Sequence, residues 1–281
     1  MRITARNLVK KFGKFSALYD LNFDVDGDII AIVGPNGSGK STLLSIVAGL
    51  RHPSRGNLYL EGIEPYKRRE DISKYISYSF EKPRFDLKIR VRDVLEACRE
   101  TCKDYDHIVS MMDEVGIKNL EDKSLYQLSS GQSQLLALSL ALYCDETYIV
   151  ILDEPLSHLD IRFQHLLIDR IYQRKRTVFT THVMEEAELI ADKILILEDG
   201  KLKWIGDSRD VYQYSIYEVI IPRQNYQKAV EMLNSSGAEI ITNLGTSTLV
   251  KNVKEEYLVK LFDERLIIGF RRAGLRVKIY G

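Results

Sequence analysis

The chain reads Gly34-Pro35-Asn36-Gly37-Ser38-Gly39-Lys40-Ser41-Thr42 at the position that decides its fold. This stretch fits G-x-x-x-x-G-K-[ST], the pattern of a phosphate-binding loop. Its glycines let the backbone turn tightly, so that N–H groups can face phosphate oxygens. The helix expected next would point its positive N-terminus at the same place. We expect Lys40 to bind the β- and γ-phosphates of a nucleotide, and the Ser41 hydroxyl to ligate Mg²⁺.

The flanking residues supply the elements that such a loop needs. Residues 28–33 form a short β-branched apolar run that predicts a buried strand, and residues 41–48 predict a buried helix that ends at Gly49. A bare match to the motif can arise by chance in a glycine-rich turn. The order of strand, loop and helix favours a true nucleotide site in an α/β fold.

The composition is ordinary for a globular protein. The 281 residues are 45% hydrophobic and 28% charged, and the formal net charge is zero, so no overall field favours nucleic acid. No apolar run reaches the roughly 18 residues that span a bilayer, and the first residues lack an apolar signal segment. We therefore expect a cytoplasmic protein.

The cysteines also favour a reducing compartment. Cys98, Cys102 and Cys144 show no disulfide pattern. Cys98 and Cys102 lie one helical turn apart, so a metal or redox pair is one interpretation. Two structural thiols are the favoured interpretation, because no other ligand cluster is close in the sequence.

The first 27 residues alternate apolar and polar positions, which predicts antiparallel strands. Phe12 lies about 20 residues before the phosphate-binding loop. Its ring can stack on a purine base, or it can be a core residue at the end of a strand. From the residues alone, the core role is the simpler interpretation.

A mainly helical stretch from about residue 85 to about residue 146 predicts a helical subdomain inserted into the α/β pattern. It contains Leu128-Ser129-Ser130-Gly131-Gln132, in which Ser129 and Gln132 have the spacing of a capping box before an apolar helix. The serine hydroxyl and the free N–H groups of that helix end can bind a second anion. Most capping boxes, however, only cap their helix.

Two carboxylates follow the next buried strand. Residues 148–152 are apolar, and Asp153 and Glu154 come directly after them. Ligands of open α/β sheets bind beyond the carboxyl ends of strands, so Asp153 can hold Mg²⁺ and Glu154 can accept a proton from an attacking water. Two solvated acids at a strand end are the alternative. His182 follows the strand predicted at 177–181 and is a candidate γ-phosphate contact.

Residues from about 215 onward carry none of these motifs and predict a small α+β domain. The expected order of strand, helix, strand, strand, helix and strand is typical of a ferredoxin-like fold. Strands are expected at 215–221, 238–242, 246–251 and 275–280, and helices at 226–233 and 255–262, with an extension to 273 as an alternative. From Tyr212 onward, ten basic and seven acidic residues leave a net charge of +3. A solvated face explains this excess, and a lipid or nucleic-acid surface is the alternative.

Taken in order, these residues resemble the ATP-binding subunit of an ABC transporter over residues 2–211. Six motifs carry the resemblance: Walker A (Gly34–Thr42), the signature (Leu128–Gln132), Walker B (Ile149–Glu154), the D-loop (Ser157–Asp160), the switch histidine (His182) and the A-loop aromatic (Phe12). The resemblance implies a P-loop NTPase core with an antiparallel β subdomain, spanning 1–211, and an appended regulatory or dimer-supporting domain at 215–281.

Three departures from the family pattern stand out. Glu81 occupies the Q-loop position, where many members have glutamine; it keeps an oxygen ligand for Mg²⁺ but loses an amide donor. Ser130 replaces a signature glycine at a right-handed helix position, where a β-carbon is tolerated. The stretch Ser133-Gln134-Leu135 replaces a more polar sequence and can alter how the helical subdomain packs.

The resemblance also implies a mechanism. Two ATPase chains, identical or different, would pair head to tail. Each ATP would lie between the Walker A motif of one chain and the signature residues of the other, which are Ser129, Ser130, Gly131 and Gln132. Asp160 would lie nearby. Phe12 would stack on adenine, and Mg²⁺ would be held by Ser41, Asp153 and Glu81. Lys40, Glu154 and His182 would be the catalytic residues. A separate transmembrane permease would hold the ATPase on the cytoplasmic face of the membrane. A separate ATPase chain with a small appended domain is typical of ABC-2 exporters.

Two other functions within the same superfamily are the alternatives. A soluble ABC ATPase could remodel a non-membrane complex, such as an iron–sulfur assembly scaffold. A DNA-repair ATPase is disfavoured, because residues 82–127 leave no room for a long coiled-coil arm. The single phosphate-binding loop argues against the tandem translation-type factors.

Overall fold

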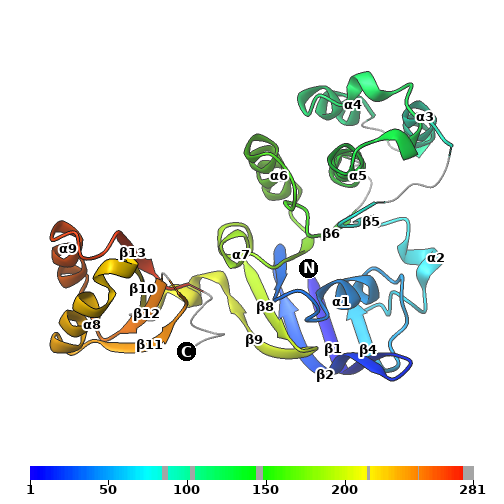
Figure 1. The fold of residues 1–281 in the computed structure, drawn as a ribbon. Coiled ribbons are helices and arrows are strands. Elements are labelled where there is room, and N and C mark those ends of the chain that lie inside the picture. Colours follow the sequence, from blue (N-terminus) through cyan, green and yellow to red (C-terminus); the bar gives the residue numbers. More distant parts are fainter. Residues whose placement is uncertain (84–87, 102–104, 144–147, 214–215, 246, 275–281) are drawn as a thin grey trace. The chain divides into compact units, whose positions relative to one another are not determined.

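The computed structural model describes residues 1–83, 88–101, 105–143, 148–213, 216–245 and 247–274 (Figure 1). The chain divides into two compact units, Met1–Ile205 and Gly206–Gly281. The sequence predicted a division slightly later, between residues 211 and 215. That the second unit folds independently stays a prediction.

A six-stranded sheet forms the centre of the first unit. Its strands are β3 (Ile29–Val33), β5 (Ile76–Ser79), β6 (Ile149–Asp153), β7 (Thr177–Thr181), β8 (Lys193–Glu198) and β9 (Lys201–Asp207). The spatial order is β5-β6-β7-β3-β8-β9, and β5 to β8 pair in parallel along it. Every residue of β3, β6 and β7 is buried, as is usual for central parallel strands. The loops that follow these three strands therefore meet at one edge of the sheet.

A second, three-stranded sheet confirms the antiparallel strands predicted at the N-terminus. It consists of β1 (Arg2–Phe12), β2 (Phe15–Asp26) and β4 (Arg55–Leu60), in the order β2-β1-β4. Leu8, Leu18 and Leu21 from this sheet share one hydrophobic core with Ile30 and Ile32 of β3. This shared core fixes the β1–β2 hairpin relative to the loop that follows β3.

The helices of the first unit connect the strands (Figure 1). They are α1 (Lys40–Val47), α2 (Arg69–Ile72), α3 (Val91–Thr101), α4 (Tyr105–Glu114), α5 (Ser130–Tyr143), α6 (Ile161–Arg174) and α7 (Met184–Ile190). Helix α1 follows β3 after the loop at residues 34–39 and contributes four fully buried side chains to the core (Leu43, Leu44, Ile46 and Val47). Helices α3, α4 and α5 lie within the predicted helical stretch, and Ser77 of β5 donates a hydrogen bond to the carbonyl of Ala141 in α5 at 2.8 Å.

The second unit has the predicted order of strands and helices. Its elements are β10 (Ile216–Ile220), α8 (Tyr226–Ser235), β11 (Glu239–Asn243), β12 (Ser247–Lys251), α9 (Glu255–Asp263) and β13 (Gly269–Arg272). The four strands form an antiparallel sheet in the order β11-β12-β10-β13. Both helices pack on this sheet around Leu233, Val250 and Leu258.

One expectation for this unit is wrong. The extension of the last helix to residue 273 is wrong: α9 ends at Asp263, Arg265 takes a left-handed φ of 59°, and β13 then pairs with β10. The buried side chains of Leu266 and Ile267 fill the core at this turn and direct the chain back to the sheet. The strand expected at 275–280 lies outside the described residues.

Two predictions about composition can also be compared with the structure. Of the helices that the structure describes, none combines the length and apolar character needed to cross a membrane. Cys98 is half-buried, and burial raises the pKa of its thiol. Cys102 and Cys144 lie outside the described residues.

Candidate active site

The loop between β3 and α1 closes around the amino group of Lys40. Lys40 Nζ donates to the carbonyl oxygens of Gly34 at 2.8 Å and Pro35 at 3.2 Å. Gly39 has a φ of 99°, and a β-carbon there would lie 2.6 Å from the carbonyl oxygen of Ala17. Only glycine fits this left-handed, crowded position. The loop therefore has the tight shape that a phosphate site needs, directly before the N-terminus of α1.

Asp153 ends β6 and lies beside the first turn of α1. Its Oδ1 accepts hydrogen bonds from Ser41 Oγ at 3.0 Å and from Thr180 Oγ1 at 2.6 Å. Burial raises the pKa of Asp153, the two hydroxyl donors oppose that shift, and the neighbouring Glu154 adds to it. The buried carboxylate and the Ser41 hydroxyl together offer hard oxygen ligands.

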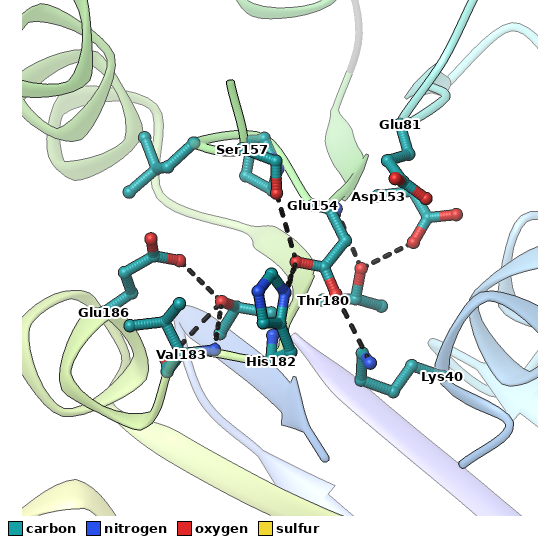
Figure 2. A network of polar contacts seen from close by, with 12 residues as sticks. Lys40, Glu81, Asp153, Glu154, Ser157, Thr180, His182, Val183 and Glu186 are labelled. Carbon is teal, nitrogen blue, oxygen red and sulfur yellow. Dashed lines mark hydrogen bonds and ion pairs between the residues drawn. The ribbon is translucent and has the colours of Figure 1, made fainter. Parts of the chain in front are cut away.

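The carboxylate of Glu154 lies between Lys40 and His182 and contacts both. Its Oε1 lies 3.3 Å from Lys40 Nζ, and its Oε2 lies 2.8 Å from His182 Nδ1 (Figure 2). The Glu154 backbone has a left-handed φ of 49°, which a non-glycine residue adopts only when its surroundings enforce it. One such restraint is the hydrogen bond from the Glu154 N–H to Thr180 Oγ1 at 2.9 Å. The turn after β6 thus aims a buried carboxylate at the phosphate-binding loop.

His182 follows β7 in a turn that is fixed from two sides. Thr181 Oγ1 donates to Glu186 Oε2 at 2.5 Å and accepts from the Val183 N–H at 3.0 Å (Figure 2). The Thr181 carbonyl accepts from the Gly34 N–H at 3.3 Å. Burial raises the pKa of Glu186, whose carboxyl group lies on α7. The turn that carries His182 is therefore tied both to α7 and to the phosphate-binding loop.

Two adjoining cavities open around these groups. The first, of about 420 Å³, is lined by Phe12, Phe15, Ala17, Asn36, Gly37, Gly39, Lys40, Ser41, Thr42, Glu81 and Glu154. The second, of about 440 Å³, is lined by Asn36, Glu81, Lys82, Glu154, Leu156, Ser157, His158, Gln164, His182, Val183 and Glu186. The structure thus brings two aromatic side chains, the phosphate-binding loop, three acids and His182 to one region.

The predicted signature and Asp160 lie outside the walls of both cavities. The predicted capping box is confirmed: the Ser129 N–H donates to Gln132 Oε1 at 3.0 Å, and the Gln132 N–H donates to Ser129 Oγ at 3.2 Å. Asp160 caps α6 by accepting from the Arg162 N–H at 3.0 Å. Within one chain these residues cap helices, and their role at a nucleotide stays a prediction.

Three residues of the site were not predicted from the sequence. Thr180 holds both Asp153 and the backbone of Glu154. Gln134, buried in α5, donates to the carbonyl oxygens of Glu154 and Pro155 at 3.4 Å each. Phe15 lines the first cavity. No local pattern marks Thr180 or Gln134, because β7 also contains Thr177 and Thr181, and α5 contains several serines besides Gln134.

The site has the groups for hydrolysis at a phosphate chain. Backbone N–H groups and Lys40 can hold the phosphates, the oxygens of Ser41 and Asp153 can hold a divalent cation, and Glu154 can accept a proton. The cavity continues past Lys40 to Phe12, so the part of a ligand beyond its phosphates would meet an aromatic ring.

Comparison with known sequences gives the relatives of the chain. The family described as "ABC transporter" matches residues 18–157. Proteins named "Sulfate/thiosulfate import ATP-binding protein" from Bradyrhizobium diazoefficiens and Synechocystis sp. are 35% and 32% identical over 232 and 228 residues. These matches cover 76% of this chain and 66% and 63% of the relatives, so the chain spans slightly less than two thirds of their length. A relative with the same name from Mesostigma viride is 30% identical over 273 residues, which is 92% of this chain and 77% of that protein.

Solved structures show the same fold. An ATP-binding subunit of an ABC transporter superposes with a TM-score of 0.67 and 22% identity, covering 76% of this chain and 92% of that one. A dimeric bacterial ABC transporter cassette superposes with a TM-score of 0.63 and 23% identity, covering 74% and 99%. The predicted α/β core of the P-loop NTPase type is therefore confirmed.

Proposed function

The chain belongs to the ABC transporter family, and from this membership we propose that it is the ATP-hydrolysing subunit of a transporter. The observation that carries the proposal is the meeting of Lys40, Asp153 and Glu154 at one edge of the sheet. Lys40 Nζ and Glu154 Oε1 are 3.3 Å apart, and Ser41 Oγ and Asp153 Oδ1 are 3.0 Å apart. A phosphate-binding cation, a metal-binding carboxylate and a proton acceptor are the parts that phosphoryl transfer to water needs.

ATP would lie in the first cavity. The N–H groups of residues 34–42 and the side chain of Lys40 would hold its phosphates, and Phe12 would stack on the adenine. Glu154 would accept the proton of the attacking water. His182, 2.8 Å from Glu154, would contact the γ-phosphate and keep the carboxylate oriented.

The residues present also fit Mg²⁺. Ser41 Oγ and Asp153 Oδ1 are hard oxygen donors on adjacent elements, and a cation would compensate the cost of burying the Asp153 charge. Glu81 lines both cavities and can add a third oxygen. The described residues contain no group of three or more His, Cys, Asp and Glu side chains that could cage a metal. Mg²⁺ would therefore also be coordinated by oxygens of the ATP phosphates, whose charge it would neutralise.

A complete site would need a second ATPase chain. In a head-to-tail dimer, Ser129–Gln132 at the N-terminus of α5 would face the γ-phosphate that is bound to the opposite chain, and Asp160 would lie at the same interface. A solved cassette with the same fold is dimeric, which supports the pairing of two chains. The capping box leaves serine and N–H groups at a helix N-terminus, which favours an anion.

The partner would be a separate transmembrane permease, with the ATPase on the cytoplasmic face of the membrane. The three relatives described above are named for import, so they do not support the ABC-2 exporter type. They also give no support to a soluble ATPase that remodels a non-membrane complex.

Calorimetry and hydrolysis assays test the proposal together. Wild type should bind Mg-ATP and release phosphate, whereas Lys40→Ala should lose tight binding. Glu154→Gln should bind Mg-ATP but hydrolyse it at least about 10²-fold more slowly, given typical general-base contributions. Unchanged affinity in Lys40→Ala, or normal turnover in Glu154→Gln, would overturn the assignment.

A further inference from the structure

Two aromatic rings, not one, lie on the base side of the first cavity. Phe12 ends β1, Phe15 begins β2, and the two are opposite each other in the antiparallel register. Directly opposed side chains of such a pair project to the same face. Both rings line the cavity, and they are 41% and 63% exposed, so each has a large free surface for a ligand.

Two cations approach Phe12 without lining the cavity. Arg51 Cζ lies 5.3 Å from the centre of the Phe12 ring, and Lys10 Nζ lies 5.1 Å from it. These distances are within the range of cation–π attraction. The cavity wall includes Phe12 but neither Lys10 nor Arg51. The cations therefore contact the ring from outside the space that a ligand would occupy.

The segment that carries Arg51 is anchored at both of its ends. The N–H of Arg51 donates to the carbonyl of Ser45 in α1 at 3.1 Å. Beyond it, the N–H of Ser54 donates to the carbonyl of Val9 at 2.7 Å, and Lys10 Nζ donates to the carbonyl of His52 at 2.6 Å. Arg51 thus links the helix behind the phosphate-binding loop to the strand that ends in Phe12.

We propose that Phe12 and Phe15 together form the base-recognition wall of the nucleotide site, with Arg51 as the residue that positions Phe12. The proposal rests on the proposed function, since it assumes that a nucleotide fills the first cavity. One ring would cover a face of the base, and the other would contact the edge of the base or the sugar. Because aromatic stacking accepts any base, this wall favours nucleotides over bare phosphate chains more strongly than it favours one base over another.

The test compares Mg-ATP with Mg-tripolyphosphate, which has the phosphates but no base. For wild type, calorimetry should show much tighter binding of Mg-ATP. Phe15→Ala should weaken Mg-ATP about fivefold or more, and Arg51→Gln about two- to fivefold, while tripolyphosphate affinity stays unchanged in both. Arg51→Lys should restore part of the loss. Arg55→Gln, which removes an exposed arginine from the same segment, should have no effect.

A double-mutant cycle shows whether Arg51 acts through Phe12. In a Phe12→Ala background, Arg51→Gln should cause no further loss of Mg-ATP affinity. Equal losses for Mg-ATP and tripolyphosphate, or an undiminished Arg51 effect without Phe12, would overturn the positioning role. If wild type binds tripolyphosphate as tightly as ATP, the aromatic wall is wrong although the phosphate site stands. If it binds neither, the proposed function fails.

Discussion

Lys40 and Glu154 form a buried ion pair: Nζ and Oε1 are 3.3 Å apart, and the two side chains are 5% and 6% exposed. Each group has further partners. Lys40 donates to two loop carbonyls, and the other carboxylate oxygen of Glu154 meets His182 and Ser157. The phosphate-binding loop and the turn after β6 are therefore coupled through two charges that have little contact with water.

This coupling predicts a non-additive effect on stability. Lys40→Met should lower the free energy of unfolding by roughly 3 kcal/mol without nucleotide, because it leaves the Glu154 charge buried and less compensated. The double variant Lys40→Met/Glu154→Gln should recover most of that loss, because neither charge then remains. Urea denaturation measures both values. Losses that simply add would show that the two charges do not stabilise each other.

Asp153 should make the protein less stable at neutral pH than an uncharged residue would. Burial raises its pKa, so the folded state favours the protonated form, and its contribution to stability falls as pH rises through the window between the unfolded and the raised folded pKa. Asp153→Asn keeps an acceptor for Ser41 and Thr180. Without Mg²⁺ it should be more stable than wild type by about 1 kcal/mol at pH 7.5, and this advantage should shrink as the pH falls into the acid range. An advantage that does not change with pH would contradict the prediction.

The motifs predicted which residues meet, because each follows a buried parallel strand and such strands end at one edge of the sheet. Residues 34–42, Asp153, Glu154 and His182 can be placed in this way from the sequence alone. The residues that hold these groups in place could not be predicted from the sequence. Thr180 and Gln134 act through tertiary hydrogen bonds, Glu186 acts through a bond to the nearby Thr181, and no sequence pattern specifies those contacts. For Phe12 the residues alone favour a core role, because an aromatic residue at a strand end fits a core, and only the resemblance implies a contact with the base. Strand β13 was not predicted, because residues 264–273 carry no clear periodicity.

Two glycines of the phosphate-binding loop should respond differently to the same substitution. Both have positive φ, but a β-carbon at Gly37 would meet nothing within 4 Å, whereas one at Gly39 would lie 2.6 Å from the Ala17 carbonyl oxygen and 2.8 Å from Leu18 Cδ2. Gly37→Ala should cost about 1–2 kcal/mol of backbone strain. Gly39→Ala should cost at least about 1 kcal/mol more, because the loop must move away from β2. Thermal unfolding of the pair tests this, and equal losses would mean that the close contact is not maintained.

The first unit should fold and bind nucleotide without the second. Each unit has its own hydrophobic core, with members between Met1 and Leu197 in one and between Tyr217 and Ile267 in the other. A chain ending at Gln213 keeps β9 and should bind Mg-ATP within about twofold of full-length affinity, since the cavity residues all precede residue 187. Circular dichroism and calorimetry check this. An unfolded product or lost affinity would show that residues 214–281 are part of the ATPase fold.

Glu154→Gln should convert ATP binding into a stable dimer of this chain. The substitution preserves the shape of the side chain, removes the proton acceptor and relieves repulsion between Glu154 and the γ-phosphate. ATP that is not hydrolysed can then keep bridging two chains, so sizing chromatography with saturating Mg-ATP should show a dimer that is weaker or absent for wild type with ADP. Ser129→Arg in the same background should abolish the dimer, because it places bulk at the N-terminus of α5 where the opposing nucleotide would lie. Arg69→Gln, which removes an exposed charge from α2, is the control for a general effect of surface charge and should leave the dimer intact. A Glu154→Gln chain that stays monomeric while it binds ATP through Lys40 would exclude a composite site built from two copies of this chain.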